Sequence, residues 1–253
     1  MLGAWRGSGH RVTVVRGLDR NVRGDVAIQH VDCSVVPPDY AELAAGFPVV
    51  VNGLPRDIRK RTISRQLVRP GDGWTGPVII KSDLNFGGIP ENMHNQAAAA
   101  HQRPLPHREA PTFNDYPILR SAADVPESSW SRPHCVVERF VPERDERGFW
   151  LRTWVFFGDR ERCNRHCSRS PIVKAGNAFY REPAAVPDEI REERRRLGFD
   201  YGKFDFVVVG NHPILIDANR TPGGSPTLTD EMARGAAALA GGIDVFLERA
   251  RAA

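Results

Sequence analysis

The segment from 203 to 224, KFDFVVVGNHPILIDANRTPGG, constrains the fold of this chain more than any other. It contains two runs of β-forming residues, FDFVVV and PILIDA, on either side of a turn-forming Gly-Asn pair, and this pattern predicts a β-hairpin. Asp205 lies in the first run and Asp217 in the second, where apolar residues are expected, and Asn219 follows. Because side chains alternate along a strand, we expect Asp217 and Asn219 on one face.

These polar positions indicate a metal site. A buried carboxylate without a partner is costly. A cluster of oxygens on one sheet face therefore indicates a hard cation, and Mg²⁺ prefers such ligands. The turn that follows, from Thr221 to Gly224, contains proline and two glycines, so its backbone amides can approach an anion closely.

Composition limits the class of protein. The 253 residues, of which 41% are hydrophobic, are enough for a packed core in one large or two to three small lobes. A net charge of +4 suits phosphate-bearing ligands, but the sequence lacks a recognisable nucleic-acid-binding motif and a phosphate-binding G-x-x-x-x-G-K-[ST] loop. We find neither a secretory signal nor a membrane span, and we expect a cytoplasmic protein.

The four cysteines are too few and too scattered for a disulfide scaffold, so we expect free thiols. Cys163, His166 and Cys167 are close enough in sequence to suggest zinc. They lack a second ligand pair at the spacing of a zinc finger, which disfavours that alternative.

Periodicity and turn residues predict the remaining elements. Residues 82–120 form a polar segment with several prolines, which we interpret as a lid or insertion with little regular structure. Its histidines, His94, His101 and His107, are expected to be exposed, with substrate gating as the alternative. We expect strands over 10–15, 25–32, 48–53, 78–81, 134–141, 150–158 and 170–176, and helices over 39–45, 57–68, 187–197 and 225–251.

Several of these features form an ordered pattern along the chain. Lys60 follows a small α/β unit, Lys81 ends a buried strand, and the strand around Glu138 leads into a polar link. The most specific part is a D/E-x-N-x-x-P-G motif, with an acidic strand residue about a dozen positions earlier. This pattern resembles the ATP-grasp superfamily. Over residues 48–245 the chain is similar to its carboxylate–amine ligases, such as glutathione synthetase, D-alanine–D-alanine ligase and the ribosomal-protein glutamate ligases.

The resemblance implies an α/β (α+β) chain with the ATP-grasp fold, in which two lobes surround a nucleotide cleft. We expect a short Rossmann-like unit at 1–53, an N-terminal lobe at 54–137 with a long loop at 82–120, and a C-terminal lobe at 138–253 that carries the metal site. The first unit is short for this family, so either the long loop binds the substrate or another subunit completes the pocket. A homodimer is therefore an expectation.

Site residues follow from the same resemblance. Asp205, Asp217 and Asn219 would bind two Mg²⁺ ions, for which Mn²⁺ can substitute, and Lys60 and Lys81 would reach the phosphates of ATP. Lys203 would steady the transferring phosphoryl group, and Gly223 and Gly224 would approach the acyl intermediate. The backbone of the hinge would read adenine, and one of two acidic residues would lie near the ribose. These residues are Glu138, Arg139, Phe140 and Val141 for adenine, and Glu143 or Asp145 for ribose.

We expect some of the basic residues after the hinge to bind substrate carboxylate or phosphate, because arginine is a bidentate donor. The candidates are Arg152, Arg162, Arg169 and Lys174, with Asn177 as an additional contact. The implied activity is a magnesium- and ATP-dependent ligase that activates a carboxylate as an acyl phosphate and joins it to an amine. Its substrates would be small molecules or peptides, with no nucleic-acid or membrane partner. The alternatives are a small-molecule kinase on the same fold and a non-catalytic ATP-binding module.

Overall fold

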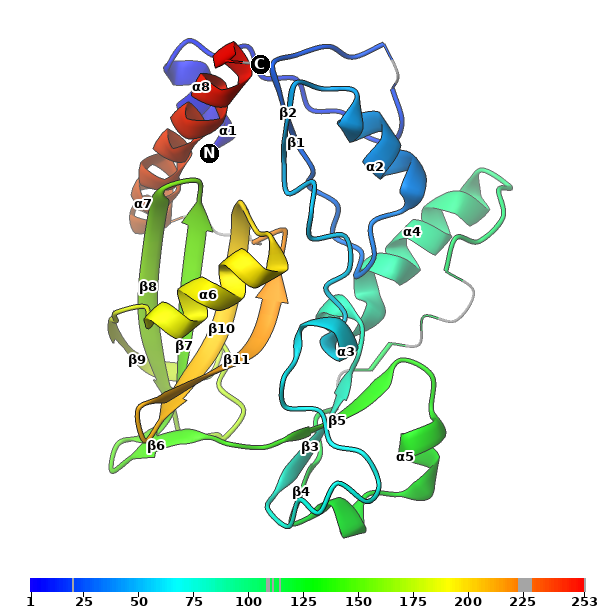
Figure 1. Ribbon diagram of the computed structural model, residues 1–253, viewed down its shortest axis with the longest axis vertical. Coiled ribbons are helices and arrows are strands. Elements are labelled where there is room, and N and C mark those ends of the chain that lie inside the picture. Colours follow the sequence, from blue (N-terminus) through cyan, green and yellow to red (C-terminus); the bar gives the residue numbers. More distant parts are fainter. Residues whose placement is uncertain (20, 108–109, 111, 114, 223–228, 253) are drawn as a thin grey trace.

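The computed structural model describes residues 1–253 apart from 20, 108–109, 111, 114, 223–228 and 253. The described residues form sheets of two, three and six strands, with helices packed around them (Figure 1). This α+β architecture agrees with the class expected from the sequence. No helix in the described ranges combines the length and the apolar character needed to cross a bilayer.

The two-stranded sheet lies near the N-terminus. Strands β1 (Val26–Ile28) and β2 (Val49–Val51) are parallel and are connected through helix α2 (Pro38–Ala45), as the sequence predicts. The predicted strand over 10–15 is wrong, since residues 11–16 have no regular structure. Val14 and Val15 are exposed, and a β-forming run that does not pair or pack stays irregular.

The three-stranded sheet has the order β4-β3-β5 and is antiparallel. The helix predicted over 57–68 is reduced to a single turn. After Ile63 the chain becomes extended, and the Val68 amide donates to the Val137 carbonyl at 2.9 Å, so pairing with β5 replaces the helix. The elements of this region are α3 (Lys60–Ile63), β3 (Val78–Ser82), β4 (Ile118–Leu119), η2 (Ala122–Asp124), α5 (Glu127–Ser131) and β5 (Cys135–Arg139).

The expectation of little regular structure over 82–120 is also wrong. This segment forms the short helix η1 (Asn85–Gly88) and the twelve-residue helix α4 (Ile89–Ala100). Pro90 lies in the first turn, where its missing amide costs nothing, and the run of alanines at the other end favours helix. The many polar residues of the segment had suggested a loop, although its alanine run favours a helix.

The six-stranded sheet is antiparallel and has the order β11-β10-β7-β8-β9, with β6 paired to β7. The strand predicted over 170–176 is wrong, because Asn177 holds that segment as a turn by hydrogen bonds to Lys174 and Ile172. The strands are β6 (Glu143–Asp145), β7 (Gly148–Phe157), β8 (Arg160–Ser168), β9 (Ala178–Pro183), β10 (Tyr201–Val209) and β11 (His212–Asn219).

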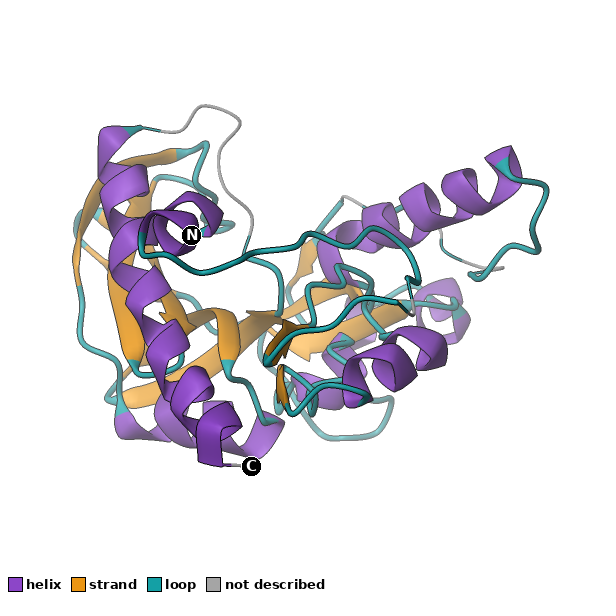
Figure 2. Cartoon of the chain, turned by 90° about the horizontal axis from the view of Figure 1, so that it is seen from above, coloured by secondary structure: helices purple, strands orange, loops and turns teal. Residues whose placement is uncertain are grey.

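Helices cover the large sheet on two sides. Helix α6 (Asp188–Leu197) packs its buried Ile190 with Trp154, Phe156, Phe204 and Phe206. The C-terminal helices run along the other side of the sheet (Figure 2), with Phe246 against Phe157. They are α7 (Asp230–Ala240), η3 (Gly241–Ile243) and α8 (Asp244–Ala252), and helix α1 (Leu2–Gly7) joins them through Trp5, which donates to the Ala240 carbonyl.

Candidate functional site

The predicted hairpin is present, and its register gathers the polar residues on one face. Strands β10 and β11 pair with Asp205 opposite Asp217 and Lys203 opposite Asn219. Phe204, which lies between Lys203 and Asp205 in the strand, points into the core. Because side chains alternate along a strand, the four polar side chains point to the other face. The sheet itself therefore brings the predicted metal ligands and Lys203 together.

A β-bulge adjusts the end of this hairpin. Asp205 pairs with Asp217 but Phe206 pairs with Leu215, so Ile216 is an extra residue in β11. The Ile216 carbonyl accepts a hydrogen bond from Lys81 Nζ at 3.1 Å. The bulge thus contributes a main-chain oxygen that helps to position a lysine from the small sheet.

Three lysines at this site each pair with a carboxylate. Lys60 and Lys81 are only 5% and 8% exposed, so each charge needs a partner nearby. The three pairs carry no net charge. They are Lys60 Nζ with Asp217 Oδ1 at 2.5 Å, Lys81 Nζ with Glu138 Oε2 at 2.8 Å, and Lys203 Nζ with Asp205 Oδ2 at 2.8 Å.

The electrostatic balance favours the charged forms. Burial alone would raise the pKa of Asp217, but Lys60 and then Lys81 outweigh it and lower that pKa to about 2. Burial opposes the charge on Lys60, yet Asp217 raises the pKa of this amine above its ordinary value. Lys203 behaves in the same way, because Asp205 outweighs the effect of burial on its pKa.

Two neighbouring residues were not identified from the sequence as part of this cluster. Thr153 Oγ1 donates to Asp205 Oδ1 at 2.9 Å, from the strand position opposite Asp205. The second residue is Tyr116. Burial raises the pKa of its phenol, and the nearby positive charge of Lys60 only partly offsets this effect. Lys174 Nζ lies 5.3 Å from the Tyr116 ring centroid, which brings this predicted residue to the edge of the cluster. A threonine in a strand and a tyrosine in a polar segment give no signal of such a role.

The hinge residues are partly engaged within the protein. The Arg139 amide donates to Gln66 and the Phe140 amide donates to Pro77. The Arg139 guanidinium lies over the Trp74 ring at 5.0 Å. Glu138 points to Lys81, so its side chain supports the lysine. Adenine recognition by 138–141 stays a prediction.

Arg152 and the two ribose candidates have partners of their own. Arg152 donates from Nη2 and Nε to Glu143 at 2.8 and 3.0 Å, and the Val208 amide donates to the same carboxylate at 2.7 Å. Asp145 accepts from the amides of Arg147 and Gly148 and so closes the turn between β6 and β7. A ribose contact by Glu143 or Asp145 stays a prediction.

Other predicted residues have partners outside the lysine–carboxylate cluster or cannot be placed. Arg162 pairs with Glu231 on α7, and Arg169 donates to the Arg147 carbonyl. Asn177 stabilises its own turn. Gly223 and Gly224 lie outside the described residues.

The zinc alternative at Cys163, His166 and Cys167 is not supported by the geometry. All three residues lie on β8, where alternation sends His166 to the face opposite the two cysteines. Among the described residues, the group that could hold a metal through histidine and cysteine is instead Cys33, His94 and His107. The sequence alone did not indicate this group, because its residues are far apart in the chain.

Arg220, within the DANRTPG motif, was also missed. Its side chain is fully buried and donates to the carbonyls of Cys33, Pro55 and Ser34. The next residue, Thr221, donates through Oγ1 to the Asp32 carboxylate. The end of β11 is therefore attached to the segment around residues 32–34. The sequence feature that could have indicated this role is the position of Arg220 inside the motif, directly after Asn219.

Comparison with known proteins supports the fold. No family model and no curated protein matches the chain. Among solved structures, a RimK domain ATP-grasp protein from Sphaerobacter thermophilus has a TM-score of 0.52 at 15% identity, over 97% of this chain and 93% of that one. The D-alanine–D-alanine ligase from Bacillus anthracis complexed with ATP has a TM-score of 0.46 at 15% identity, over 90% and 80%.

A third structure, the macrocyclase MdnC from Microcystis aeruginosa bound with precursor peptide MdnA, has a TM-score of 0.38 at 12% identity over 64% of this chain. Here the match spans about half, 47%, of the macrocyclase. The chain has the ATP-grasp fold, as the likeness to the Sphaerobacter protein shows and as the sequence motifs indicated.

Proposed function

We propose that this protein is an ATP-dependent carboxylate–amine ligase that uses magnesium. The observation that carries the proposal is the convergence of three lysines with Asp205, Asp217 and Asn219 at the end of the β10–β11 hairpin, on an ATP-grasp fold. Solved structures similar in fold include proteins named as a D-alanine–D-alanine ligase and as a macrocyclase.

The donor set fits magnesium. Asp205, Asp217 and Asn219 offer carboxylate and amide oxygens on one sheet face, and hard cations prefer such ligands. The lysine–carboxylate pairs are neutral as a group, and two Mg²⁺ ions with ATP⁴⁻ add no net charge. Bound magnesium would neutralise phosphate charge. The cluster therefore has no excess charge to discourage binding of the complete nucleotide.

The chain's own residues would position the reacting groups. Lys60 and Lys81 come from α3 and β3 and act as point charges toward phosphate oxygens. Glu138 and the Ile216 carbonyl hold Lys81, and Asp205 holds Lys203. In the proposed mechanism Lys203 would contact the transferred phosphoryl group. Phosphoryl transfer depends mainly on such positioning and charge stabilisation.

The proposed reaction has two steps. A substrate carboxylate oxygen attacks the terminal phosphorus of ATP, the bond to the bridging oxygen breaks, and ADP leaves. An amine nitrogen then attacks the acyl carbon of the acyl phosphate, loses a proton, and inorganic phosphate leaves. The products are an amide, ADP and phosphate, so atoms and charge balance.

The test measures ADP and free phosphate with purified protein, magnesium and ATP. A panel of amino acids and small acids is offered with and without amines. A ligase releases ADP and free phosphate in equal amounts, and only when both a carboxylate substrate and an amine substrate are present. A kinase retains phosphate on its product, and a binding module binds ATP without turnover; either result contradicts the proposal.

Two matched variants sharpen this test. Asp217→Asn removes a carboxylate from the cluster, whereas Asp159→Asn removes an exposed one at the β7–β8 turn. We expect the first to abolish turnover and the second to leave it unchanged. Equal activity of both variants would show that the chemistry takes place elsewhere in the protein.

A further inference from the structure

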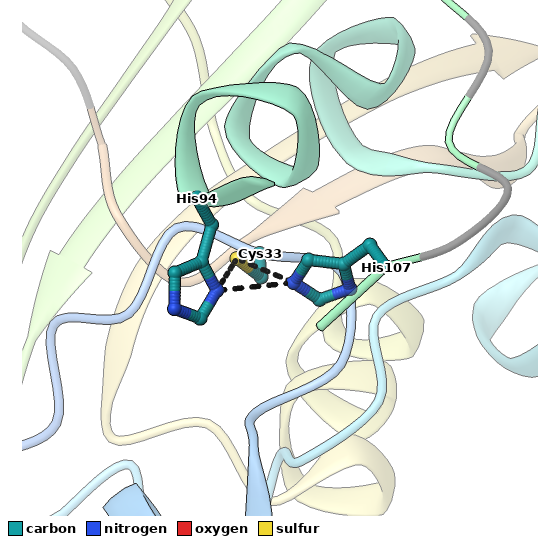
Figure 3. A group of neighbouring side chains, drawn as sticks. All are labelled: Cys33, His94 and His107. Carbon is teal, nitrogen blue, oxygen red and sulfur yellow. Dashed lines mark hydrogen bonds between the residues drawn. The ribbon is translucent and has the colours of Figure 1, made fainter. Parts of the chain in front are cut away.

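A second cluster lies apart from the lysine–carboxylate site. Cys33 follows β1, His94 lies on α4, and His107 lies in the segment after α4, and their side chains point toward one another (Figure 3). Cys33 Sγ is 3.9 Å from His94 Nδ1 and 3.7 Å from His107 Nε2. The two ring nitrogens are 3.1 Å apart.

These separations match tetrahedral zinc coordination. With Zn–S of about 2.3 Å and Zn–N of about 2.05 Å, tetrahedral angles separate sulfur from nitrogen by about 3.6 Å and the two nitrogens by about 3.3 Å. Each observed distance is within a few tenths of an ångström of these values. An ion would fit with small side-chain adjustments.

Hydrogen bonds hold the backbone near the three side chains in place. Asn95, next to His94, binds the main chain of His107 in both directions, at 2.5 Å to its carbonyl and 2.9 Å from its amide. The Cys33 carbonyl accepts from the buried Arg220. Such outer contacts hold ligands in place before a metal arrives.

A buried acidic residue adds an independent signal. Glu91 is 2% exposed and lies one helical turn before His94 on α4. Its Oε1 accepts from the Ser34 amide at 2.6 Å, whereas its Oε2 is buried and has no hydrogen-bond partner among the described residues. Both Glu91 and His107 line one cavity. An unsatisfied buried carboxylate beside the cluster favours a nearby cation.

We propose that Cys33, His94 and His107 bind a zinc-type divalent ion, with the fourth coordination position taken by water or an added ligand. Thiolate and imidazole suit zinc and related transition metals, whereas magnesium prefers oxygen. One thiolate and two neutral imidazoles leave a charge of +1 on the complex, which the Glu91 carboxylate would balance. The site is thus chemically distinct from the oxygen-rich cluster.

The position of the ion suggests a structural role. It would tie α4 and the segment at 107 to the chain beside β1. Asp32, the residue before Cys33, accepts from Thr221 and Asn85, so this junction continues to the end of β11. A bound ion would therefore stabilise the surroundings of the DANRTPG motif.

The competing interpretation is a hydrogen-bonded triad without metal, since 3.1 Å also suits a hydrogen bond between two imidazoles. Cobalt substitution separates the two. The full chain is stripped with a chelator and titrated with Co²⁺ and then Zn²⁺, without nucleotide. We expect a thiolate-to-cobalt charge-transfer band and tetrahedral cobalt bands that saturate at a single ion per chain and disappear as zinc displaces cobalt.

Variants assign the ligands. Cys33→Ala should remove the charge-transfer band, and His94→Ala should weaken zinc binding by at least about 10-fold. Cys135→Ala and His101→Ala alter other residues of the same types and should change neither. Glu91→Gln, which keeps the shape of the side chain, should weaken zinc binding by about 10- to 100-fold.

Absence of the band from folded wild-type protein would overturn this proposal, as would an equal band in Cys33→Ala. Because the titration uses no ATP, failure of the ligase proposal would not affect it. Conversely, failure of the zinc proposal would not affect the ligase proposal, which the ADP and phosphate assay tests independently.

Discussion

Lys60 Nζ lies 2.5 Å from Asp217 Oδ1, across 157 positions of sequence, and joins helix α3 to strand β11. The proposed function has Lys60 contact phosphate and Asp217 bind metal, yet in the structure each neutralises the other. On that proposal, both groups would exchange this contact for phosphate and metal when ATP and magnesium bind.

The first prediction concerns the stability of that pair. Asp217→Asn leaves the buried Lys60 ammonium without its carboxylate, and we expect the free energy of unfolding to fall by about 3 kcal/mol. Lys60→Met should also destabilise the protein. The double variant should lose about 1–3 kcal/mol less than the sum of the single losses, as measured by urea unfolding near neutral pH. Additive losses would show that the two side chains are not coupled.

The second prediction concerns acid stability. The pKa of Asp217 in the folded protein is about 2, below the value of 3.8 for a free aspartate. The contribution of Asp217 to the free energy of unfolding is therefore complete above about pH 4. It is lost as the pH falls toward 2, and the total loss is about 2 kcal/mol. Unfolding free energies of wild type and Asp217→Asn should converge by about that amount between pH 5 and about pH 2. A constant difference would contradict the assigned pKa.

The third prediction concerns Lys81 and depends on the proposed activity. Lys81→Met removes a buried positive charge aimed at the site, and kcat/KM for ATP should fall about 100-fold, corresponding to about 3 kcal/mol. Glu138→Gln keeps a hydrogen-bond acceptor beside Lys81 and should lose less. Arg160→Met, at an exposed position, is the matched control and should behave as wild type. A loss in the control comparable to that in Lys81→Met would reject the specific role of Lys81.

The fourth prediction concerns Arg220. Its guanidinium satisfies carbonyls of three residues, and Arg220→Met would leave them buried without a donor. We expect a loss of about 2–4 kcal/mol in unfolding free energy. Arg220→Lys should recover only part of it, because a single ammonium cannot reproduce the planar donor geometry. Arg195→Met, at an exposed helix position, should change stability by less than about 0.5 kcal/mol. Full recovery by lysine would argue that charge alone matters.

Strands with strong local patterns were predicted well. The hairpin around Gly210 and the strands at 135–139 and 148–157 are confirmed, because their β-forming runs are bounded by turn residues. The run at 10–15 has similar residues but lies outside any sheet. Local propensity becomes a strand only where another strand or a core accepts it.

By itself the sequence determined the α+β class, the acidic hairpin and its motif, and the order of the basic and acidic positions along the chain, because these depend on local periodicity and spacing. Tertiary structure alone decided which charges became partners, as with Lys60 and Asp217, and which distant residues met, as with Cys33, His94 and His107. The reason is that such contacts join segments tens of residues apart. Their geometry comes from sheet register and from the packing of α3 and α4, to which neighbouring residues in the sequence give no guide.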